Sequence, residues 1–236
     1  MMPQPEDQGA STHGGVHLAL RCQACDAVHT YWVLGVVTGD GQAPMVVGEF
    51  PCTACGVYAP LTLAAGAYRS LLGAVFRSLL LRRAPVTQQV IVETAEGQRA
   101  SLPSAYLQFQ AQTNDHPQDA LAWLRMGMIE HALERPRAAR MSMNHAYRAD
   151  PNLLEAVINQ AILLEGDGDS HHAWTVLLRA LRTRAQWWSC AQYPQEKVEE
   201  FAALYNRMRS TYGADQTQAL MPDFYTLERG KPKRSE

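Results

Sequence analysis

The sequence predicts an α+β protein in which a small N-terminal β domain precedes an array of α-helical hairpins. Two Cys-x-x-C pairs among β-rich segments in residues 16–62 predict the first part, and a match of the C-terminal half with itself predicts the second. The chain has 236 residues, of which 47% are hydrophobic, which is enough for a buried core and unlike a disordered chain. A formal net charge of -2 argues against a protein whose whole surface binds nucleic acid.

Residues 16–62 are expected to form strands. Segments 30–37 and 45–50 are rich in β-branched and aromatic residues, and the Gly-Asp-Gly of 39–41 marks a turn between them. Residues 1–15 are expected to be a disordered tail. They lack the basic start and apolar stretch of a secretory signal, so we expect a cytoplasmic protein. In that compartment paired cysteines serve metal or redox chemistry more often than disulfides.

Residues 63–102 are expected to link the two parts through an amphipathic helix and a β-hairpin. Apolar residues of Tyr68–Leu81 recur on one helical stripe. Arg69 and Arg77 interrupt this run, and central arginines argue against a transmembrane segment. The helix could lie on a membrane surface, but docking on the protein's own core is the commoner arrangement.

The four cysteines of the β domain form two pairs, each of which could supply two thiolates to one tetrahedral metal ion. In such a loop the residue after the second cysteine often needs a positive φ, which Gly56 accepts freely and Asp26 tolerates. The predicted ligands are Cys22, Cys25, Cys52 and Cys55.

With strands entering and leaving both pairs, residues 16–62 resemble the zinc-ribbon family with its rubredoxin-like knuckles. The segment between the pairs, 26–51, is longer than the usual ~15–20 residues, which a longer hairpin would accommodate. The resemblance implies a structural Zn²⁺, because four thiolates leave no open position for water. Redox dithiols or an iron site remain alternatives. His29 could replace a ligand but is expected to face solvent, and Cys190 is expected to be a buried, inert thiol.

Residues 103–212 are expected to be helical hairpins, followed by a tail at 213–236. When this part of the chain is aligned with itself at one constant offset, small residues recur where helices must approach closely and large ones where a gap must be filled. The matched pairs are Gly127 with Ala161, Ala139 with Ala173, Met143 with Leu177 and Ala146 with Ala180.

This pattern resembles the tetratricopeptide (TPR) family, whose units repeat every ~34 residues. Trp123, Met126 and Gly127 stand where the family has Trp-x-x-Leu-Gly, whereas Glu130 replaces an aromatic residue and Val157 replaces the second tryptophan. Two repeats bury too little surface alone, so helices near 103–113 and 195–212 are expected to cap them.

The resemblance implies a concave face, lined by the first helix of each hairpin, that binds a peptide or helix of another protein. Chaperone-binding members hold a C-terminal carboxylate there with Lys and Asn, and of such a set only Asn159 is present, so no carboxylate clamp is expected. The face is mostly apolar and is covered either by Tyr68–Leu81 or by a partner. The predicted partner-binding residues are Leu121, Leu124, Met128, His131, Ile158, Asn159 and Ile162, with Glu155 and Glu165 on the same face.

We therefore expect a non-catalytic protein–protein interaction adaptor or assembly factor. The alternative is a nucleic-acid-associated regulatory protein that uses the zinc ribbon and arginine-rich helical faces to bind phosphates. Acidic residues interleaved with these arginines instead favour a solvated surface of mixed charge. Residues 1–60 also carry a net charge of -4, from one arginine against five acidic residues. A third reading is an enzyme whose residues meet only in three dimensions, since no catalytic motif is present. The arginines in question are Arg135, Arg137, Arg140 and Arg148, with Arg179, Arg182 and Arg184.

Overall fold

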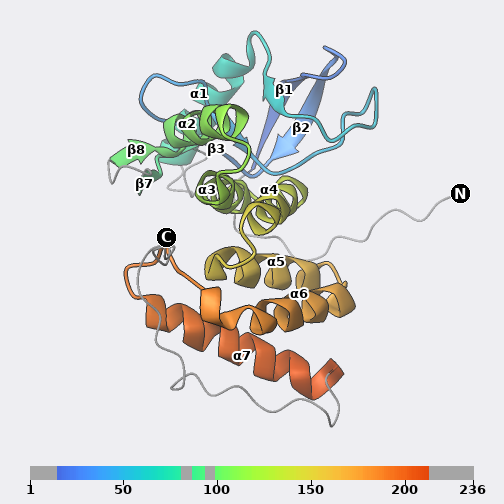
Figure 1. Ribbon diagram of the computed structural model, residues 1–236. Coiled ribbons are helices and arrows are strands. Elements are labelled where there is room, and N and C mark those ends of the chain that lie inside the picture. The colour runs from blue at the N-terminus through green and yellow to red at the C-terminus, as the bar shows by residue number, and fades with distance from the viewer. Residues whose placement is uncertain (1–14, 81–86, 94–98, 213–236) are drawn as a thin grey trace, which may run out of the picture. The chain divides into compact units, whose positions relative to one another are not determined.

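The computed structural model describes residues 15–80, 87–93 and 99–212 (Figure 1). The predicted tails at 1–15 and 213–236 lie outside these ranges, apart from Gly15. The chain divides into two compact units, the first comprising Met1–Leu107 with Leu133–Arg135 and the second comprising Gln108–Ala132 with Pro136–Glu236.

Short strands form three small sheets in the first unit. The first sheet has the order β2–β1–β5, the second β4–β3–β6, and the third is the hairpin β7–β8. All pairings are antiparallel except that of β3 with β6. The strands are β1 (Val16–Cys22), β2 (Val28–Val33), β3 (Gly35–Val37), β4 (Met45–Val47), β5 (Leu61–Leu63), β6 (Thr87–Gln88), β7 (Ile91–Glu93) and β8 (Arg99–Ser101).

The core of the first unit lies on one face of the first sheet. Along β1 the side chains alternate, so that Leu18 and Leu20 are buried while His17 is exposed. Leu18 pairs with Tyr31 of β2, whose ring also faces the core. The same alternation places Cys22 on the buried face, at the end of β1.

Helix α1 (Ala67–Leu80) confirms the predicted linking helix and packs against β1. Leu71 and Ala74 join the core cluster of the first sheet. The other side of the expected stripe does not pack, because Leu72 and Phe76 are 59% and 65% exposed. The predicted stripe is therefore buried in part, along Leu71 and Ala74, and exposed at Leu72 and Phe76.

The second unit contains successive helical hairpins. Helix α3 packs against α4, α5 against α6, and α7 against both α5 and α6. Figure 1 shows α5, α6 and α7 lying in successive layers. The helices are α2 (Leu102–Asp115), which spans the division between the units, α3 (Ala120–Ala132), α4 (Pro136–Ala149), α5 (Leu154–Gly166), α6 (Ser170–Arg182) and α7 (Pro194–Tyr212), with a 3₁₀ turn, η1 (Arg184–Gln186).

Burial follows the predicted repeat, which confirms the TPR-like helical array. Ala139 and its equivalent Ala173 are fully buried, and Gly127 lies so close to α4 that an added Cβ would meet the Met143 side chain at 2.9 Å. Close approach of the paired helices therefore explains the small residues. Glu130, in the place of an aromatic residue, is buried and accepts a hydrogen bond from the Ser142 hydroxyl at 2.6 Å.

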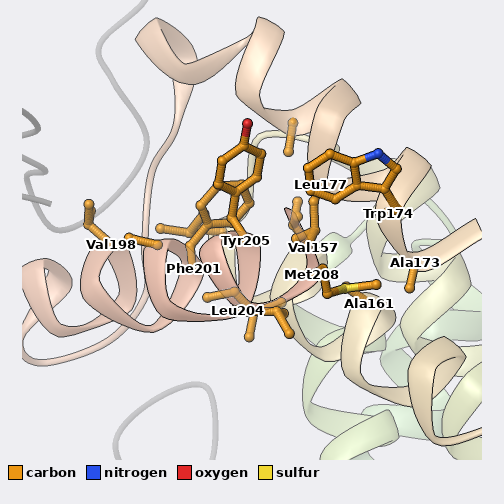
Figure 2. Packing of buried hydrophobic residues seen from close by; sticks show 14 of the residues in the cluster. Val157, Ala161, Ala173, Trp174, Leu177, Val198, Phe201, Leu204, Tyr205 and Met208 are labelled. Carbon is orange, nitrogen blue, oxygen red and sulfur yellow. The ribbon is translucent and has the colours of Figure 1, made fainter. Parts of the chain in front are cut away.

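The largest hydrophobic cluster joins α5, α6 and α7, and confirms the expected helix near 195–212. Figure 2 shows Val157 and Ala161 of α5 packed with Trp174 of α6 and with Phe201 and Tyr205 of α7. The Trp174 and Tyr205 rings stack at a centroid distance of 5.1 Å. Helix α7 is thus an integral part of the second unit.

Candidate metal centre and helix face

The first cysteine pair lies in a tight loop that leaves β1. The backbone N–H of Cys22 donates to the carbonyl of Ala27, and the N–H of Asp26 donates back to the carbonyl of Cys22, both at 2.9 Å. Asp26 has a φ of 62°, as predicted for the residue after the second cysteine. The N–H of Ala24 points at the Cys22 sulfur, at 3.4 Å. This is the arrangement expected of a metal knuckle.

The second pair repeats the same loop. Cys52 N–H donates to the carbonyl of Val57 at 2.9 Å, and Gly56 N–H donates to the carbonyl of Cys52 at 2.7 Å. Gly56 has a φ of 70°, which confirms the prediction for this position. The N–H of Thr53 donates to the hydroxyl of Tyr31 at 3.2 Å, so a core residue of β2 anchors the loop.

The two loops bring four sulfur atoms together. All four lie within 4.8 Å of one another, with 4.0 Å between those of Cys22 and Cys55 and 3.6 Å between those of Cys25 and Cys52. Sulfurs around one tetrahedral zinc ion at ~2.3 Å lie ~3.8 Å apart, whereas a disulfide needs ~2.05 Å. Four cysteines so placed can bind one metal ion.

The pKa values of two of these thiols diverge. Backbone N–H groups, that of Cys55 first, lower the pKa of Cys52 to about 6. A backbone hydrogen bond at Ala27 lowers the pKa of Cys25, but contacts with the neighbouring thiols and desolvation outweigh it and raise the value to about 12. Crowded sulfurs cannot all become thiolates without a compensating positive charge, which a metal ion supplies.

No other residue joins this group within the described ranges. His29, the alternative ligand considered above, is half-buried on β2 and is not among the side chains that could share a metal ion. Arg21 forms an exposed ion pair with Asp26 at 2.8 Å, beside the first loop.

The predicted partner-binding residues differ widely in exposure. Leu124 and Ile158, which occupy equivalent positions on α3 and α5, are both only 1% exposed and belong to hydrophobic clusters. Their side chains are therefore covered within the chain itself, and their role in binding a partner stays a prediction. Leu121 and Asn159 are half-buried, and His131 is exposed.

Two residues of this predicted face present large apolar side chains to solvent. Met128 on α3 is 55% exposed, and Ile162 on α5 is 42% exposed. The repeat that aligns Gly127 with Ala161 also aligns Met128 with Ile162, so the two occupy the same position in successive hairpins. We call the face of α3 and α5 that carries them the first-helix face.

Leu124 is covered by a segment that sequence reasoning treated only as a break between helices. Trp188, which follows η1, is 4% exposed and belongs to the same cluster as Leu124. Its indole N–H donates to the Asp150 carboxylate at 3.0 Å. The repeat pattern contains no signal for this contribution of Trp188 to the cluster.

Glu155 is the polar residue whose role the sequence did not reveal. It was expected on the concave face, but it is 7% exposed and one carboxylate oxygen accepts three hydrogen bonds. The donors are the N–H groups of Cys190 and Ala191, at 3.0 and 2.9 Å, and the hydroxyl of Ser189. Cys190 is half-buried rather than buried as predicted, and desolvation and the Glu155 charge raise the pKa of its thiol to about 11.

Most arginines of the alternative hypothesis lie exposed on α4 and α6 and in η1, whereas Arg135 precedes α4, is half-buried and donates to the carbonyl of Val46 at 2.8 Å. Arg140 forms an ion pair with the Asp167 carboxylate, so at least one is paired with an acid rather than available to phosphate. A phosphate-binding stripe stays a prediction.

No protein-family model matches the chain. A curated peroxisomal targeting signal receptor of Eremothecium gossypii is 28% identical over 102 residues, which is 43% of this chain and 18% of the receptor. Among solved structures, the type III secretion translocator chaperone SycD of Yersinia enterocolitica has a TM-score of 0.39 at 15% identity, covering 63% of this chain and 96% of SycD. PcrH in complex with the chaperone binding region of PopD gives the same values. Within the described residues, no helix is long and apolar enough to cross a membrane.

Proposed function

We propose that this protein is a non-catalytic adaptor or assembly factor that binds a peptide or helix of another protein on the first-helix face. The observation that carries the proposal is the pair Met128 and Ile162, exposed at equivalent positions of successive hairpins. Large apolar side chains placed in register on neighbouring helices provide anchors for an apolar segment of a partner. The flexible thioether of Met128 suits such adaptable contacts.

Polar groups beside these anchors support recognition of a protein segment. His131 is exposed on the last turn of α3, and the half-buried Asn159 lies on α5. An imidazole and a side-chain amide can bond to the main chain of a bound peptide. The matched receptors are, by name, receptors for a targeting signal, and the match spans less than a fifth of their length. That likeness supports the class of ligand only.

We further propose that the four cysteines hold a structural Zn²⁺. Bound there, zinc would link the two loops and stabilise the first sheet, as metal does in small domains with few other stabilising contacts. Cys22 and Cys52 are buried while Cys25 and Cys55 are exposed, so the site lies at the surface of its unit. With four protein ligands it has no open position for a reacting water, which supports a role in folding rather than in catalysis.

A comparison of variants tests the proposed interface. The double variant M128D/I162D places charge on both anchors, and M141D places it on α4, where Met141 is 65% exposed and outside the first-helix face. Tagged proteins are used to capture partners from native lysate, with cross-linking. We expect both variants to fold and only M128D/I162D to lose partners. A folded double variant that retains every partner of the wild type would refute this use of the face.

A further inference from the structure

The second unit contains an insertion relative to its own repeat. Val198 and Ala202 of α7 pack in the same cluster as Val157 and Ala161 of α5, with the same spacing along the helix. A third repeat in unbroken register would put Ala191 in the position of Val157, but the structure puts Val198 there. Helix α7 thus stands where the first helix of a third repeat would begin, displaced along the chain. The extra residues correspond to Trp187–Tyr193, which lie between η1 and α7.

The insertion follows an extended path beside the start of α5. Trp188 N–H donates to the carbonyl of Asn152, and Leu154 N–H donates to the carbonyl of Trp188, both at 3.0 Å. These bonds form a parallel bridge between Leu153 and Trp188. Main-chain pairing of this kind is how an extended peptide ligand commonly joins a protein surface.

One aromatic side chain anchors the insertion. Trp188 is 4% exposed and belongs to one hydrophobic cluster with Leu124 and Ala120 of α3 and Ala156 of α5. The tryptophan before it has a different role, since Trp187 packs on Phe201 of α7 at a ring distance of 4.7 Å. The hydrogen bonds to the start of α5 therefore come from Trp188 and the residues after it.

Glu155 holds the residues that follow. One oxygen accepts from the hydroxyl of Ser189 and from the N–H groups of Cys190 and Ala191. The other oxygen, Oε2, is buried without a hydrogen-bond partner among the described residues. A buried carboxylate oxygen that is left unpaired is costly, which indicates a site able to accept another donor.

We infer that the start of the first-helix face, around Leu124 and Glu155, is a binding site for extended peptides, and that Trp188–Ala191 is the chain's own ligand in it. The ligand class is an extended segment in which a large aromatic residue precedes a hydroxyl residue, as Trp188 precedes Ser189. This inference rests on the proposed function, since it defines part of the same face. It implies that an external segment of this type competes with the insertion, while Met128 and Ile162 stay accessible.

A synthetic peptide tests the inference directly. The probe is a fluorescent peptide with the sequence of residues 186–193, carrying Cys190→Ser to prevent oxidation. The receptor is the full chain in which Trp188–Ala191 is replaced by Gly-Ser-Gly-Ser, so that Trp187 and α7 keep their contacts. We expect saturable binding by anisotropy, and at least about tenfold weaker binding to the wild type, where the bound insertion leaves few sites open.

Two controls assign the contacts. A peptide that also carries Trp188→Ala should bind at least about tenfold more weakly, and so should the intact peptide when the receptor carries Glu155→Gln. A replaced chain that keeps helical circular dichroism and a cooperative melt, yet does not bind the peptide, overturns the inference. If the chain with Gly-Ser-Gly-Ser does not fold, the full-length variant W188A/S189A serves as the receptor, and a folded W188A/S189A that does not bind the peptide also overturns the inference. Loss of structure in both would show that the insertion is an inseparable part of the core, which also overturns the inference.

The proposed function is tested separately. M128D/I162D leaves Trp188 and Glu155 intact, so failure of that variant to lose partners would count against the adaptor proposal alone. Failure of the peptide to bind a folded, replaced chain would count against the intramolecular ligand alone.

Discussion

Truncation of Leu124 provides a quantitative test of the packing of the second unit. Leu124→Ala removes three carbon atoms at ~0.8 kcal/mol each, or about 2.4 kcal/mol of transfer free energy. Leu124 is 1% exposed and packed against Trp188, so a cavity adds to this value, and we expect a loss of about 3 kcal/mol. Met128, one helical turn later and 55% exposed, is the matched control, and Met128→Ala should cost less than about 1 kcal/mol.

Urea unfolding followed by far-ultraviolet circular dichroism measures both values. With a slope of about 2 kcal/mol per molar urea, Leu124→Ala should lower the midpoint by about 1.5 M, while Met128→Ala shifts it by less than about 0.5 M. Equal midpoint shifts for the two variants would refute the prediction, because the larger shift expected for Leu124→Ala follows from the burial of Leu124 and the exposure of Met128. Adding Trp188→Ala completes a double-mutant cycle. Since Leu124 and Trp188 share a cluster, we expect a coupling of about 0.5–3 kcal/mol, and strict additivity would show that Trp188 does not cover Leu124.

The other predictions concern the cysteines. Elemental analysis should find one zinc ion per chain, and a folded, metal-free protein in which the thiols of Cys22, Cys25, Cys52 and Cys55 titrate readily would contradict the proposed metal site. Chelation should remove the β signal of the first unit and leave most helical circular dichroism, whereas complete loss of helix would show that the two units unfold together. Because the pKa of Cys190 is raised to about 11, its thiol stays protonated at pH 8 and becomes reactive only as the pH approaches that value. In zinc-loaded protein, a thiol reagent should therefore modify Cys190 at least about tenfold more slowly at pH 8 than free cysteine, and a rate equal to that of free cysteine would contradict the raised pKa.

Local patterns in the sequence were sufficient to predict the two cysteine loops and the helical hairpins. The Cys-x-x-C spacing, with Asp26 and Gly56 at positions of positive φ, encodes each loop within a few residues. Likewise, Gly127 and the alanines that recur from one hairpin to the next record where paired helices approach closely. These features depend on neighbours in the chain or on a repeated environment, so periodicity and residue type reveal them.

The tertiary structure decided which apolar residues of the helices are exposed. The predicted binding face groups Leu124 with Met128, but the first is 1% exposed in a cluster with Trp188 and the second is 55% exposed. The same holds for Glu155, whose carboxylate became a buried acceptor only because Ser189 and the N–H groups after it, far along the chain, fold back onto α5. An extended segment without periodicity carries no signal of where it will lie, because its position is set by contacts that are distant in the sequence and by the space left between helices.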